Sequence, residues 1–541
     1  MKIALVNPQT ENDDMREIYG FHENLALALI AAALRKRGHQ VVLVDQRVHR
    51  LTDREVAHRI AGEGAELVGF SVNYATLKPA LKVAQLLKVT GAPTVVFGGE
   101  HVTYLDDGVL GAYACVDLVV RGEGEQGFLA VADALRAGRD VRGERGISYW
   151  DREKDVCVRT PVRSPVADLD ELPFASRDVA DQALAQGTPI EIGILGQRGC
   201  PFPCSFCNAN RFLGNETKGM RYRTAANIAD EIEQLGPRLA EHDLLLRFYD
   251  ATWVTRSPAS RAWAVALCDE LEERGLRVPF DVFVRSDSFD LTSRDDLRLI
   301  RRLRRAGMVS TYLGLEAGDD EVLDVYNKKV HANASIRAFE EFRRAGVSGS
   351  TNGVITFHQS VTLPQIANTV TFLERLGLCT LWNLCSRVET LPGIRLGDDM
   401  ITRPRRAVWD VLNYALLDPG ARALYELLTE TSETSYVGRL EDFLSRRLRD
   451  VARVRDFRAG EPVASEITRR LDRDIRDVQR LTSAFAAEAI DGLIASDGGR
   501  CPDRTRVVRY TDEMLFRLRR LATEYRPLLG AGPTDWYATA A

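Results

Sequence analysis

The sequence lacks the long apolar runs that a membrane protein needs. No run approaches the roughly 20 residues of a membrane-spanning helix, and the apolar part of the first eight residues is too short for a secretory signal. A large excess of one charge is also missing, because the formal net charge is -5 over 541 residues. Such mild acidity argues against nucleic acid as the main partner. We therefore expect a cytoplasmic protein that works without a membrane or nucleic-acid partner.

Cysteine is too scarce for a disulfide scaffold. The chain has nine cysteines, and three of them fall in one short segment, which indicates a reducing compartment. Internal repeats and long low-complexity segments are missing as well. The length exceeds the roughly 250–300 residues at which a single hydrophobic core stops growing, so we expect several globular domains.

Cys200, Cys204 and Cys207 are the most informative residues. They stand in the segment G-C-P-F-P-C-S-F-C, with the spacing C-x3-C-x2-C. Three thiolates so close together can hold three corners of a [4Fe–4S] cluster and leave the fourth iron without a protein ligand. An open iron is what S-adenosylmethionine (SAM) requires, because its amino and carboxylate groups can chelate there. A zinc knuckle or three unrelated core cysteines are alternatives, but zinc usually takes a fourth nearby Cys or His, and this segment, called the cluster loop below, holds no His.

Residues 1–150 alternate short apolar strands with helices, which is typical of a doubly wound parallel sheet. We predict strands at 2–7, 41–45, 67–71, 94–97 and 118–120, and helices over 24–38 and from 77 onward. Glycines follow the fourth and fifth strands, and ligands of such sheets bind outside the carboxyl ends of the strands. Glycine at these ends lets the backbone approach a large ligand closely.

The order of these strand-end motifs resembles the cobalamin-binding domain that precedes many radical SAM cores. The motifs are N-P after the first strand, G-F-S at the third, G-G-x-H-x-T after the fourth and D-L-V-V-R-G-E-G-E at the fifth. The resemblance implies that strand-end loops hold the nucleotide tail of cobalamin, with the matching residues Ser71, Gly98, Gly99, His101, Gly122 and Glu123. A nucleotide-binding or purely structural Rossmann-like domain is the alternative, although no G-x-G-x-x-G follows the first strand.

The loop after the first strand lacks a histidine. Many cobalamin enzymes place a His there, in a D-x-H-x-x-G motif, to ligate cobalt from below, whereas residues 7–12 of this chain read N-P-Q-T-E-N. We therefore expect no protein His on cobalt, and Asn73 or Tyr74 facing its lower side instead. Without a strong axial donor the cobalt is more easily reduced, which is the lever that axial ligands also use in haem.

The strand–helix rhythm returns at residue 189, after a connector at 151–188 that contains D-L-D-E-L-P-F. We expect strands at 191–195, 244–248, 280–284, 311–315 and 353–357, with 381–385 approaching a last one. The cluster loop opens at the carboxyl end of the first of them. Together with the aromatic residue before the third Cys, this pattern resembles the partial (β/α)6 barrel of the radical SAM superfamily, whose chemistry gathers at the carboxyl ends of the strands.

The resemblance assigns SAM contacts to residues at these strand ends. They are Phe206, Tyr249, Asp250, Arg285, Asp287 and Glu316. The phenylalanine would pack near the adenine, the Tyr-Asp pair would contact the amino group, and the last three would hold the ribose or the methionyl part. Simple ion pairs at the barrel mouth are the alternative for those three. One departure is F-H-Q-S-V-T at 357–362, where many relatives carry G-x-P-x-E-T, so no particular substrate can be inherited from them.

Beyond residue 400 the pattern is helical and rich in arginine, with Leu and Phe at helical spacing. We therefore predict an α/β protein with four parts: a cobalamin-binding Rossmann-like domain at 1–150, a linker at 151–188, a radical SAM partial TIM barrel at 189–400 and a mainly helical C-terminal domain at 401–541.

The resemblance implies a cobalamin-dependent radical SAM C-methyltransferase. It would act on a carbon of a small secondary metabolite or of its carrier-bound precursor, as in antibiotic biosynthesis. Its cofactors would be a [4Fe–4S] cluster, SAM and methylcobalamin, and an electron donor such as flavodoxin or ferredoxin would be a partner. The alternatives are ring rearrangement or oxidative cyclisation without methyl transfer, polar methyl transfer without a deoxyadenosyl radical, and a cobalamin-binding sensor with a structural cluster.

Overall fold

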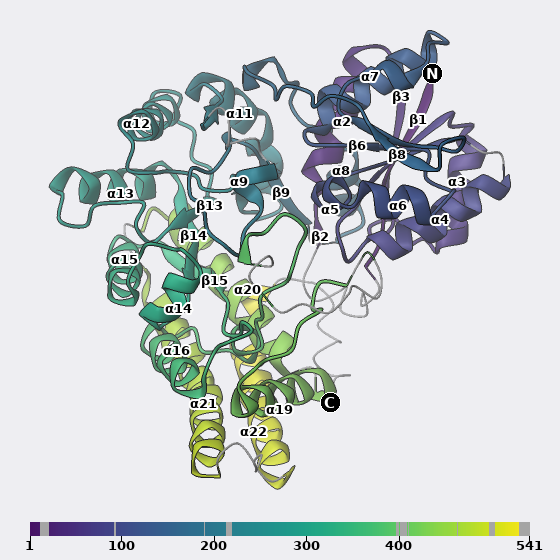
Figure 1. Cartoon of the computed structure of the whole chain (residues 1–541). Helices are drawn as coiled ribbons and strands as arrows, with labels where there is room; N and C mark the ends of the chain where they lie inside the picture. Colours follow the sequence, from purple (N-terminus) through teal and green to yellow (C-terminus); the bar gives the residue numbers. More distant parts are fainter. Residues whose placement is uncertain are drawn as a thin grey trace.

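The structure is a computed structural model. It describes residues 1–10, 21–90, 93–188, 190–212, 219–396, 400, 408, 410–435, 437–461, 464–496 and 504–529. Residues 11 and 12 of the loop that lacks the histidine, and the last part of the predicted C-terminal domain from 530 on, lie outside this description. Figure 1 shows an N-terminal α/β domain, a central sheet surrounded by helices, and C-terminal helices on the far side of that sheet.

The N-terminal sheet confirms the predicted doubly wound fold. Its strands run in the order β3-β1-β4-β5-β6-β7-β8, and the first five are parallel. These five are β1 (Lys2–Asn7), β3 (Gln40–Asp45), β4 (Leu67–Ser71), β5 (Thr94–Gly98) and β6 (Leu118–Val120). The accompanying helices are α2 (Leu25–Lys36), α3 (Asp53–Glu63), α4 (Leu77–Thr90), α5 (Glu100–Tyr104), α6 (Asp106–Ala112) and α7 (Gly124–Arg136). The order reverses direction between β1 and β4, which is where ligands bind in open α/β sheets.

This sheet continues past residue 150, which corrects the predicted domain boundary. The antiparallel strands β7 (Ile147–Asp151) and β8 (Val156–Arg159) extend it, so the expected connector begins with a strand of the N-terminal sheet. Asp106 of α6 is fully buried and holds the hairpin through Arg159, with Nη2 and Oδ1 2.7 Å apart. The rest of the connector includes α8 (Asp178–Ala185).

The central sheet is the partial barrel. Its order is β15-β14-β13-β12-β9-β2, and all pairings are parallel. The barrel strands are β9 (Ile190–Ile194), β12 (Leu246–Phe248), β13 (Phe280–Arg285), β14 (Met308–Glu316) and β15 (Ser348–Val354). The helices that alternate with them are α11 (Ala225–Glu241), α12 (Pro258–Glu273), α13 (Arg294–Ala306), α14 (Asp320–Val325), α15 (Ala332–Arg344) and α16 (Leu363–Leu376). The edge strand β2 (Phe21–His22) comes from the start of the chain and pairs with β9.

The expected approach to a last strand at 381–385 is wrong, because Leu381–Leu384 form a short helix, α17. Thr380 caps this helix by accepting a hydrogen bond from the Asn383 N–H. A single parallel bridge between Phe357 and Arg387 takes the place of the last barrel strand. The local cap thus overrides the apolar character that predicted an extended segment.

The C-terminal part is helical, as predicted. It contains α19 (Pro419–Ser435), α20 (Val437–Arg458), α21 (Glu466–Ala495), α22 (Arg504–Glu524) and α23 (Arg526–Leu529). Helix α20 packs against β14, β15 and α17, so it joins the helical part to the open side of the barrel. No described helix is both long and apolar enough to cross a membrane.

Glu441 on α20 is a buried carboxyl at this junction. It is fully buried and accepts hydrogen bonds from the Leu381 N–H of α17 (3.0 Å) and from the Thr482 hydroxyl of α21 (3.0 Å). Burial raises the pKa of Glu441 to about 8, although both hydrogen bonds lower it. The folded protein therefore holds this proton at a pH at which the unfolded chain has released it.

We predict that Glu441→Gln weakens the loss of stability on going from pH 5 to pH 8. In the natural chain, the raised folded pKa makes stability fall as pH rises from the unfolded value of about 4.5 to about 8, by at most about 1.4 kcal/mol per pH unit. Urea unfolding at several pH values measures this slope, and the comparison variant Thr482→Val, which keeps the carboxyl but removes a hydrogen bond that lowers its pKa, should retain the slope and extend it to higher pH. An unchanged pH slope in Glu441→Gln would show that this carboxyl does not titrate as described.

Candidate active site

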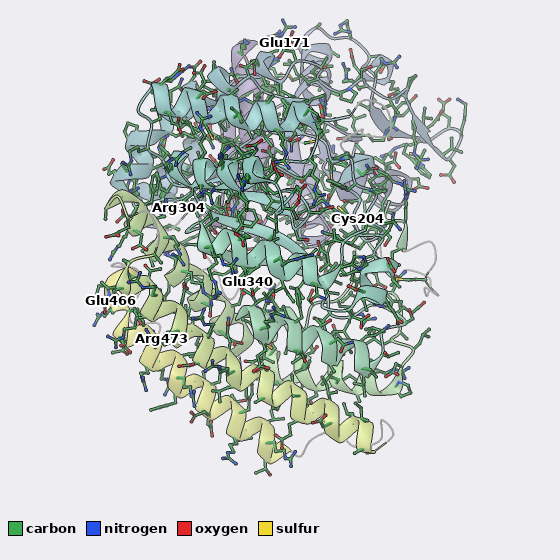
Figure 2. All side chains as sticks on the ribbon, turned by 90° about the vertical axis from the view of Figure 1, so that its left-hand side faces the viewer. Glu171, Cys204, Arg304, Glu340, Glu466 and Arg473 are labelled. Carbon is green, nitrogen blue, oxygen red and sulfur yellow. The ribbon has the colours of Figure 1, made fainter. Side chains whose placement is uncertain are left out.

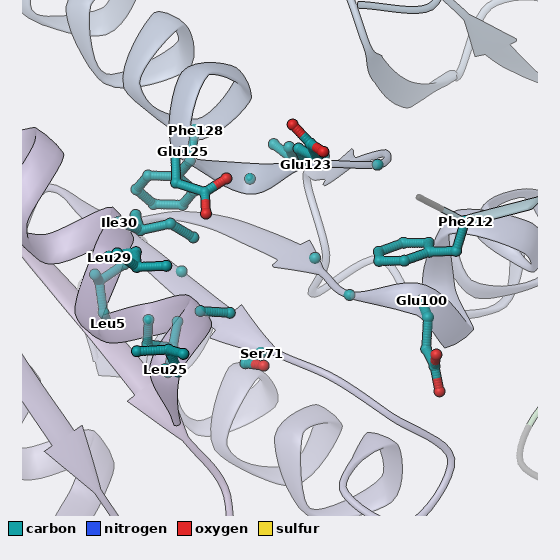
Figure 3. A pocket seen from close by; sticks show the side chains of 18 of the residues that line it. Leu5, Leu25, Leu29, Ile30, Ser71, Glu100, Glu123, Glu125, Phe128 and Phe212 are labelled. Atoms are coloured by element: carbon teal, nitrogen blue, oxygen red, sulfur yellow. The ribbon is translucent and has the colours of Figure 1, made fainter. Parts of the chain in front are cut away.

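A cavity of ≈ 350 Å³ lies at the carboxyl ends of the N-terminal strands. Of the residues predicted to bind cobalamin, its lining includes Ser71, Gly98, Gly99, Gly122 and Glu123. Asn73, Tyr74 and His101 are not among the lining residues that the structure describes. Figure 3 shows apolar side chains from β1, α2 and α7 gathered at one end of the cavity, with Glu100 and Phe212 at the other. An apolar chamber with a polar rim suits the nucleotide tail of a large cofactor.

Two glycines shape this cavity. Gly99 has φ 117°, and a Cβ there would lie 2.5 Å from the Val72 carbonyl oxygen, so only glycine fits without a shift of the backbone. A Cβ on Gly69 would lie 2.5 Å from the Phe128 ring, which lets this ring lie directly against β4. The two glycines therefore allow close packing that sets the cavity wall, of the Phe128 ring against β4 and of the segment after β5 against Val72.

Tyr74 and His101 lie at the seam between the N-terminal domain and the barrel. The Tyr74 hydroxyl donates to Glu389 Oε1 at 2.5 Å, and Glu389 follows the Phe357–Arg387 bridge. His101 is buried, and its Nε2 lies 2.7 Å from the Val408 carbonyl oxygen. Asn73 is exposed and forms a turn, with its Oδ1 accepting from the N–H groups of the next residues. These contacts do not test whether Asn73 or Tyr74 faces the lower side of cobalt, so that role stays a prediction.

The cluster loop leaves the barrel after β9, at the carboxyl end of the sheet. The Cys200 carbonyl accepts a hydrogen bond from the Asn210 side chain (2.8 Å), and the Cys207 Sγ accepts from the Ala209 N–H (3.4 Å). Burial, followed by the neighbouring thiolates, raises the pKa of Cys207 to about 12, and burial also raises the pKa of Cys200. Figure 2 shows Cys204 across the barrel from Arg304, which stands before the amino end of β14.

The three cysteines fit a cluster better than a single ion. They lie within eight residues of one another, and the Cys207 N–H donates to the Cys204 carbonyl oxygen at 3.3 Å, so the segment that carries the second and third cysteines is a tight turn. No group of three His, Cys, Asp or Glu side chains in the described ranges is arranged to hold one metal ion, which gives no support to the zinc alternative. The ligands of a [4Fe–4S] cluster each bind a different iron and need not converge on one point. Three partly buried cysteines in one short loop are suited to ligate such a multivalent cationic centre as thiolates.

Arg285, at the end of β13, connects the cluster loop with the barrel mouth. Its Nη1 donates to Cys204 Sγ at 3.2 Å, and its Nε donates to Asp287 Oδ1 at 2.8 Å. The guanidinium also lies over the Phe202 ring, 3.9 Å from the centroid. Arg285 and Asp287 are thus an ion pair, as the alternative to SAM binding proposed, and the arginine additionally touches a cluster cysteine.

Glu316 ends β14 and is paired with Lys328, whose Nζ lies 2.5 Å from Oε1. Both side chains are buried, and Glu316 has φ 64°, a left-handed conformation that a non-glycine residue rarely adopts. Phe206 packs edge-on against Tyr326, with ring centroids 5.4 Å apart, and Lys328 Nζ lies 6.0 Å from the Phe206 centroid. A glutamate with a strained backbone and its counter-ion therefore lie near an aromatic pair that includes Phe206, the residue before the third cysteine.

Asp250 braces the entry to the cluster loop. Its Oδ1 accepts from the N–H groups of Gly196 and Gln197, both at 2.9 Å, and its buried Oδ2 has no hydrogen-bond partner in the part of the chain that the structure describes. Burial raises the pKa of Asp250 to about 7. The neighbouring Tyr249 donates to Glu191 Oε1 at 2.6 Å and lines the cavity. An unpartnered carboxyl oxygen is consistent with a role in binding an amino group, and this role stays a prediction.

Five residues of the site were not predicted from the sequence. They are Lys328, Glu389, Arg198, Arg221 and Glu125. Only the last had a signal, since it belongs to the R-G-E-G-E motif after the fifth strand. The two arginines flank the cluster loop, and both hold carboxylates of the N-terminal domain.

We predict that Arg285→Met lowers the reduction potential of the cluster by tens of millivolts. Reduction adds negative charge, and the variant removes a cation and a hydrogen-bond donor from a ligand sulfur. An EPR-monitored redox titration of the reconstituted protein measures the shift. Arg256→Met is the matched control, because Arg256 donates to the Asp287 carbonyl without touching a cysteine. Equal potentials in the Arg285 variant and the natural protein would contradict the prediction.

Two family models match the chain. The model described as a B12 binding domain matches residues 12–132, and the model described as the radical SAM superfamily matches residues 194–373. The first contains most of the residues that line the cavity at the strand ends, and the second begins just before the cluster loop and includes β12 to β15.

Relatives share both parts. An uncharacterized methyltransferase of Pyrococcus horikoshii is 27% identical over 424 residues, covering 77% of this chain and 87% of the relative. The anaerobic magnesium-protoporphyrin IX monomethyl ester cyclase of Rubrivivax gelatinosus is 27% identical over 394 residues, covering 71% of this chain and 66% of the relative. The hopanoid C-3 methylase of Methylococcus capsulatus is 25% identical over 341 residues, covering 61% and 60%.

Solved structures share the fold. The cobalamin-dependent SAM radical enzyme OxsB, with aqua-cobalamin and SAM bound, superposes with a TM-score of 0.72 at 14% identity, covering 100% of this chain and 81% of that one. The radical SAM methyltransferase TsrM from Kitasatospora setae gives a TM-score of 0.58 at 17% identity, covering 74% and 75%. Fold, site geometry and both domain models agree. The chain is therefore an enzyme of the cobalamin-dependent radical SAM family, which includes methyltransferases, and its cofactors are cobalamin, SAM and a [4Fe–4S] cluster.

Proposed function

We propose that this enzyme transfers a methyl group to a carbon atom of a small secondary metabolite or of its carrier-bound precursor. The observation that supports the proposal is that the wall of the cobalamin cavity includes Arg198, at the base of the cluster loop. Glu123 and Glu125 line that cavity and are ion-paired with Arg198, which stands two residues before Cys200. Both cofactors must reach one substrate carbon, and this contact supports such an arrangement. The relatives named methyltransferase and methylase support the same activity.

The cofactors supply the difficult chemistry when bound: one-electron cleavage of SAM from the cluster, and a methyl group on cobalamin. The chain's own residues hold and orient them. Cys200, Cys204 and Cys207 would ligate the cluster, and Arg285 donates to one of these sulfurs. Glu316 and Lys328 are already paired, so their charges are fixed before a ligand arrives and need little reorganisation.

Aromatic packing would keep water away from the reacting groups. Phe206 lies against Tyr326, and Tyr326 lies against His358, with ring centroids 5.6 Å apart. His358 is buried, and burial lowers its pKa to about 4, so it is neutral at physiological pH. This uncharged, close-packed wall excludes solvent from the side of the third cysteine. An external electron donor such as a flavodoxin or ferredoxin would complete the system.

A second candidate is ring rearrangement or oxidative cyclisation without methyl transfer. Three of the relatives are named anaerobic magnesium-protoporphyrin IX monomethyl ester cyclases. The segment F-H-Q-S-V-T at the end of the fifth barrel strand differs from the usual motif at that place, so the substrate side of the barrel is this chain's own. Polar methyl transfer to a nucleophilic carbon is the remaining variant.

We predict that SAM carrying a labelled methyl group labels the protein-bound cobalamin and then a small-molecule product. The reduced, fully loaded enzyme is incubated anaerobically with this SAM and a metabolite extract, and the label is followed by mass spectrometry. Label in a carbon of the product supports methyl transfer. Cleavage of SAM to 5′-deoxyadenosine with an unlabelled product would support rearrangement or cyclisation, and labelled product without 5′-deoxyadenosine would support polar transfer.

Matched cysteine variants show whether the cluster drives this reaction. Cys204→Ala should abolish SAM cleavage and most of the bound iron, because one corner of the cluster loses its ligand. Cys268→Ala is the control, because Cys268 is a buried core residue of α12 outside the loop. Equal iron content and SAM cleavage in the two variants would argue against the assigned ligands.

A further inference from the structure

The cluster loop is closed at its base by two short antiparallel strands. These are β10 (Gln197–Arg198) and β11 (Arg221–Tyr222), and together they are called the neck below. Arg198 and Arg221 are directly opposite each other in the register of this pair. Like charges directly opposite in a sheet destabilise the pairing. The neck therefore needs negative charge from elsewhere to stay closed.

The N-terminal domain supplies that charge through its R-G-E-G-E turn. Glu123 pairs with both arginines: its Oε2 lies 3.2 Å from Arg198 Nη1, and Arg221 Nη2 donates to its Oε1. Glu125 accepts hydrogen bonds from both terminal nitrogens of Arg198, Nη1 and Nη2. Arg198 is 7% exposed and Glu125 is 4% exposed, so water screens this pair little. Opening the neck would leave buried charges without partners, which costs several-fold more than breaking a surface pair.

The same residues form the wall of the cobalamin cavity. Glu123, Glu125 and Arg198 all line it, together with Gln197 of the neck and Phe212 at the end of the short helix α9 (Ala209–Phe212) that follows the cluster loop. Figure 3 shows the carboxylates of Glu123 and Glu125 at this wall, with Phe212 facing the same space. A molecule bound in the cavity therefore touches the ion pairs that close the neck. The three cysteines lie in the segment between the two strands of the neck.

We propose that Arg198 is a positioning residue that couples the two cofactor sites: with Glu123 and Glu125 it makes cobalamin binding and cluster binding mutually favourable. Two ligands are coupled when both bias one two-state element, and the coupling is then equal in both directions. The element here is the neck. A cluster on the cysteines favours the closed neck, and a closed neck completes the cavity wall. Neither cofactor site is then fully formed without the other.

Aquacobalamin titration tests this coupling. Its dissociation constant is measured by absorbance for the iron-free chain and for the chain with a reconstituted cluster, both anaerobic and without substrate. We expect the cluster-loaded protein to bind about fivefold or more tightly. In Glu125→Gln this ratio should fall toward one, because the variant removes the charge that secures Arg198. A contact of Glu125 with cobalamin itself would change both constants equally, so the ratio isolates the coupling.

The control is Asp178→Asn. Asp178 of α8 also forms a bidentate ion pair with a residue of the N-terminal domain, Arg35 of α2, with N–O distances of 2.7 and 3.0 Å. Asp178 belongs neither to the neck nor to the residues that line the cavity. This variant should keep the ratio of the natural protein. A ratio of one in the natural protein, or an unchanged ratio in Glu125→Gln, would overturn the proposal.

Hydrogen exchange provides a test that needs no variant. In the natural, iron-free chain, aquacobalamin should slow amide exchange in residues 196–198 and 221–224, because it stabilises the closed neck. Unchanged exchange there on saturation with cobalamin would equally overturn the proposal. Neither measurement uses substrate or turnover, so its failure leaves the proposed methyl transfer standing, and an enzyme that transfers no methyl group could still show the coupling.

Discussion

The buried ion pairs between the N-terminal domain and the base of the cluster loop are the constraint on which the site depends. Each sheet presents its ligand-binding edge at the carboxyl ends of its strands, but nothing within either sheet fixes the distance between those two edges. Arg198 and Arg221 do so by binding carboxylates of the opposite domain. Because the charges are buried, any rearrangement that separates them carries a large electrostatic cost. With the ion pairs formed, the two cofactor sites therefore have a defined placement relative to each other.

Other charged side chains in and around the barrel are also paired with a residue of opposite charge. Arg285 is paired with Asp287, Glu316 is paired with Lys328, and Arg247 inside the barrel is held between Glu191 and Asp281, at 3.0 and 2.8 Å. A polar site whose ions are already neutralised can receive a polar ligand by exchanging hydrogen bonds, without burying a new unpaired charge. The Oδ2 of Asp250 is a buried exception, since it has no partner among the described residues.

Local patterns made much of this architecture predictable, and long-range contacts did not. The cysteine motif, and each glycine motif after β5 and β6, consists of residues that are close together in the sequence, so its chemistry could be predicted from the sequence. The predicted parallel strands of the N-terminal sheet were also found. Glu123 was recognised as a cavity residue, but its partners Arg198 and Arg221 are 75 and 98 residues away. An ion pair between residues so far apart in the sequence produces no periodic pattern from which it could be predicted. The helix at Leu381–Leu384 was mistaken for an approach to a strand because a four-residue helix cannot display its period.

The edge strand β2 gives the chain an unusual path through the molecule. After β1 has entered the N-terminal sheet, residues 21 and 22 join the barrel sheet beside β9, and the chain then returns to the N-terminal domain as α2. At a synthesis rate of roughly 5–20 residues per second, this strand waits on the order of ten to thirty seconds for its partner to emerge from the ribosome. The barrel sheet therefore cannot take up this edge strand until β9 has been made, although the strand is carried by the N-terminal part of the chain. A cut between the two sheets would separate β2 from β9, and an evolutionary exchange of the cobalamin module would have to keep this contact outside the module.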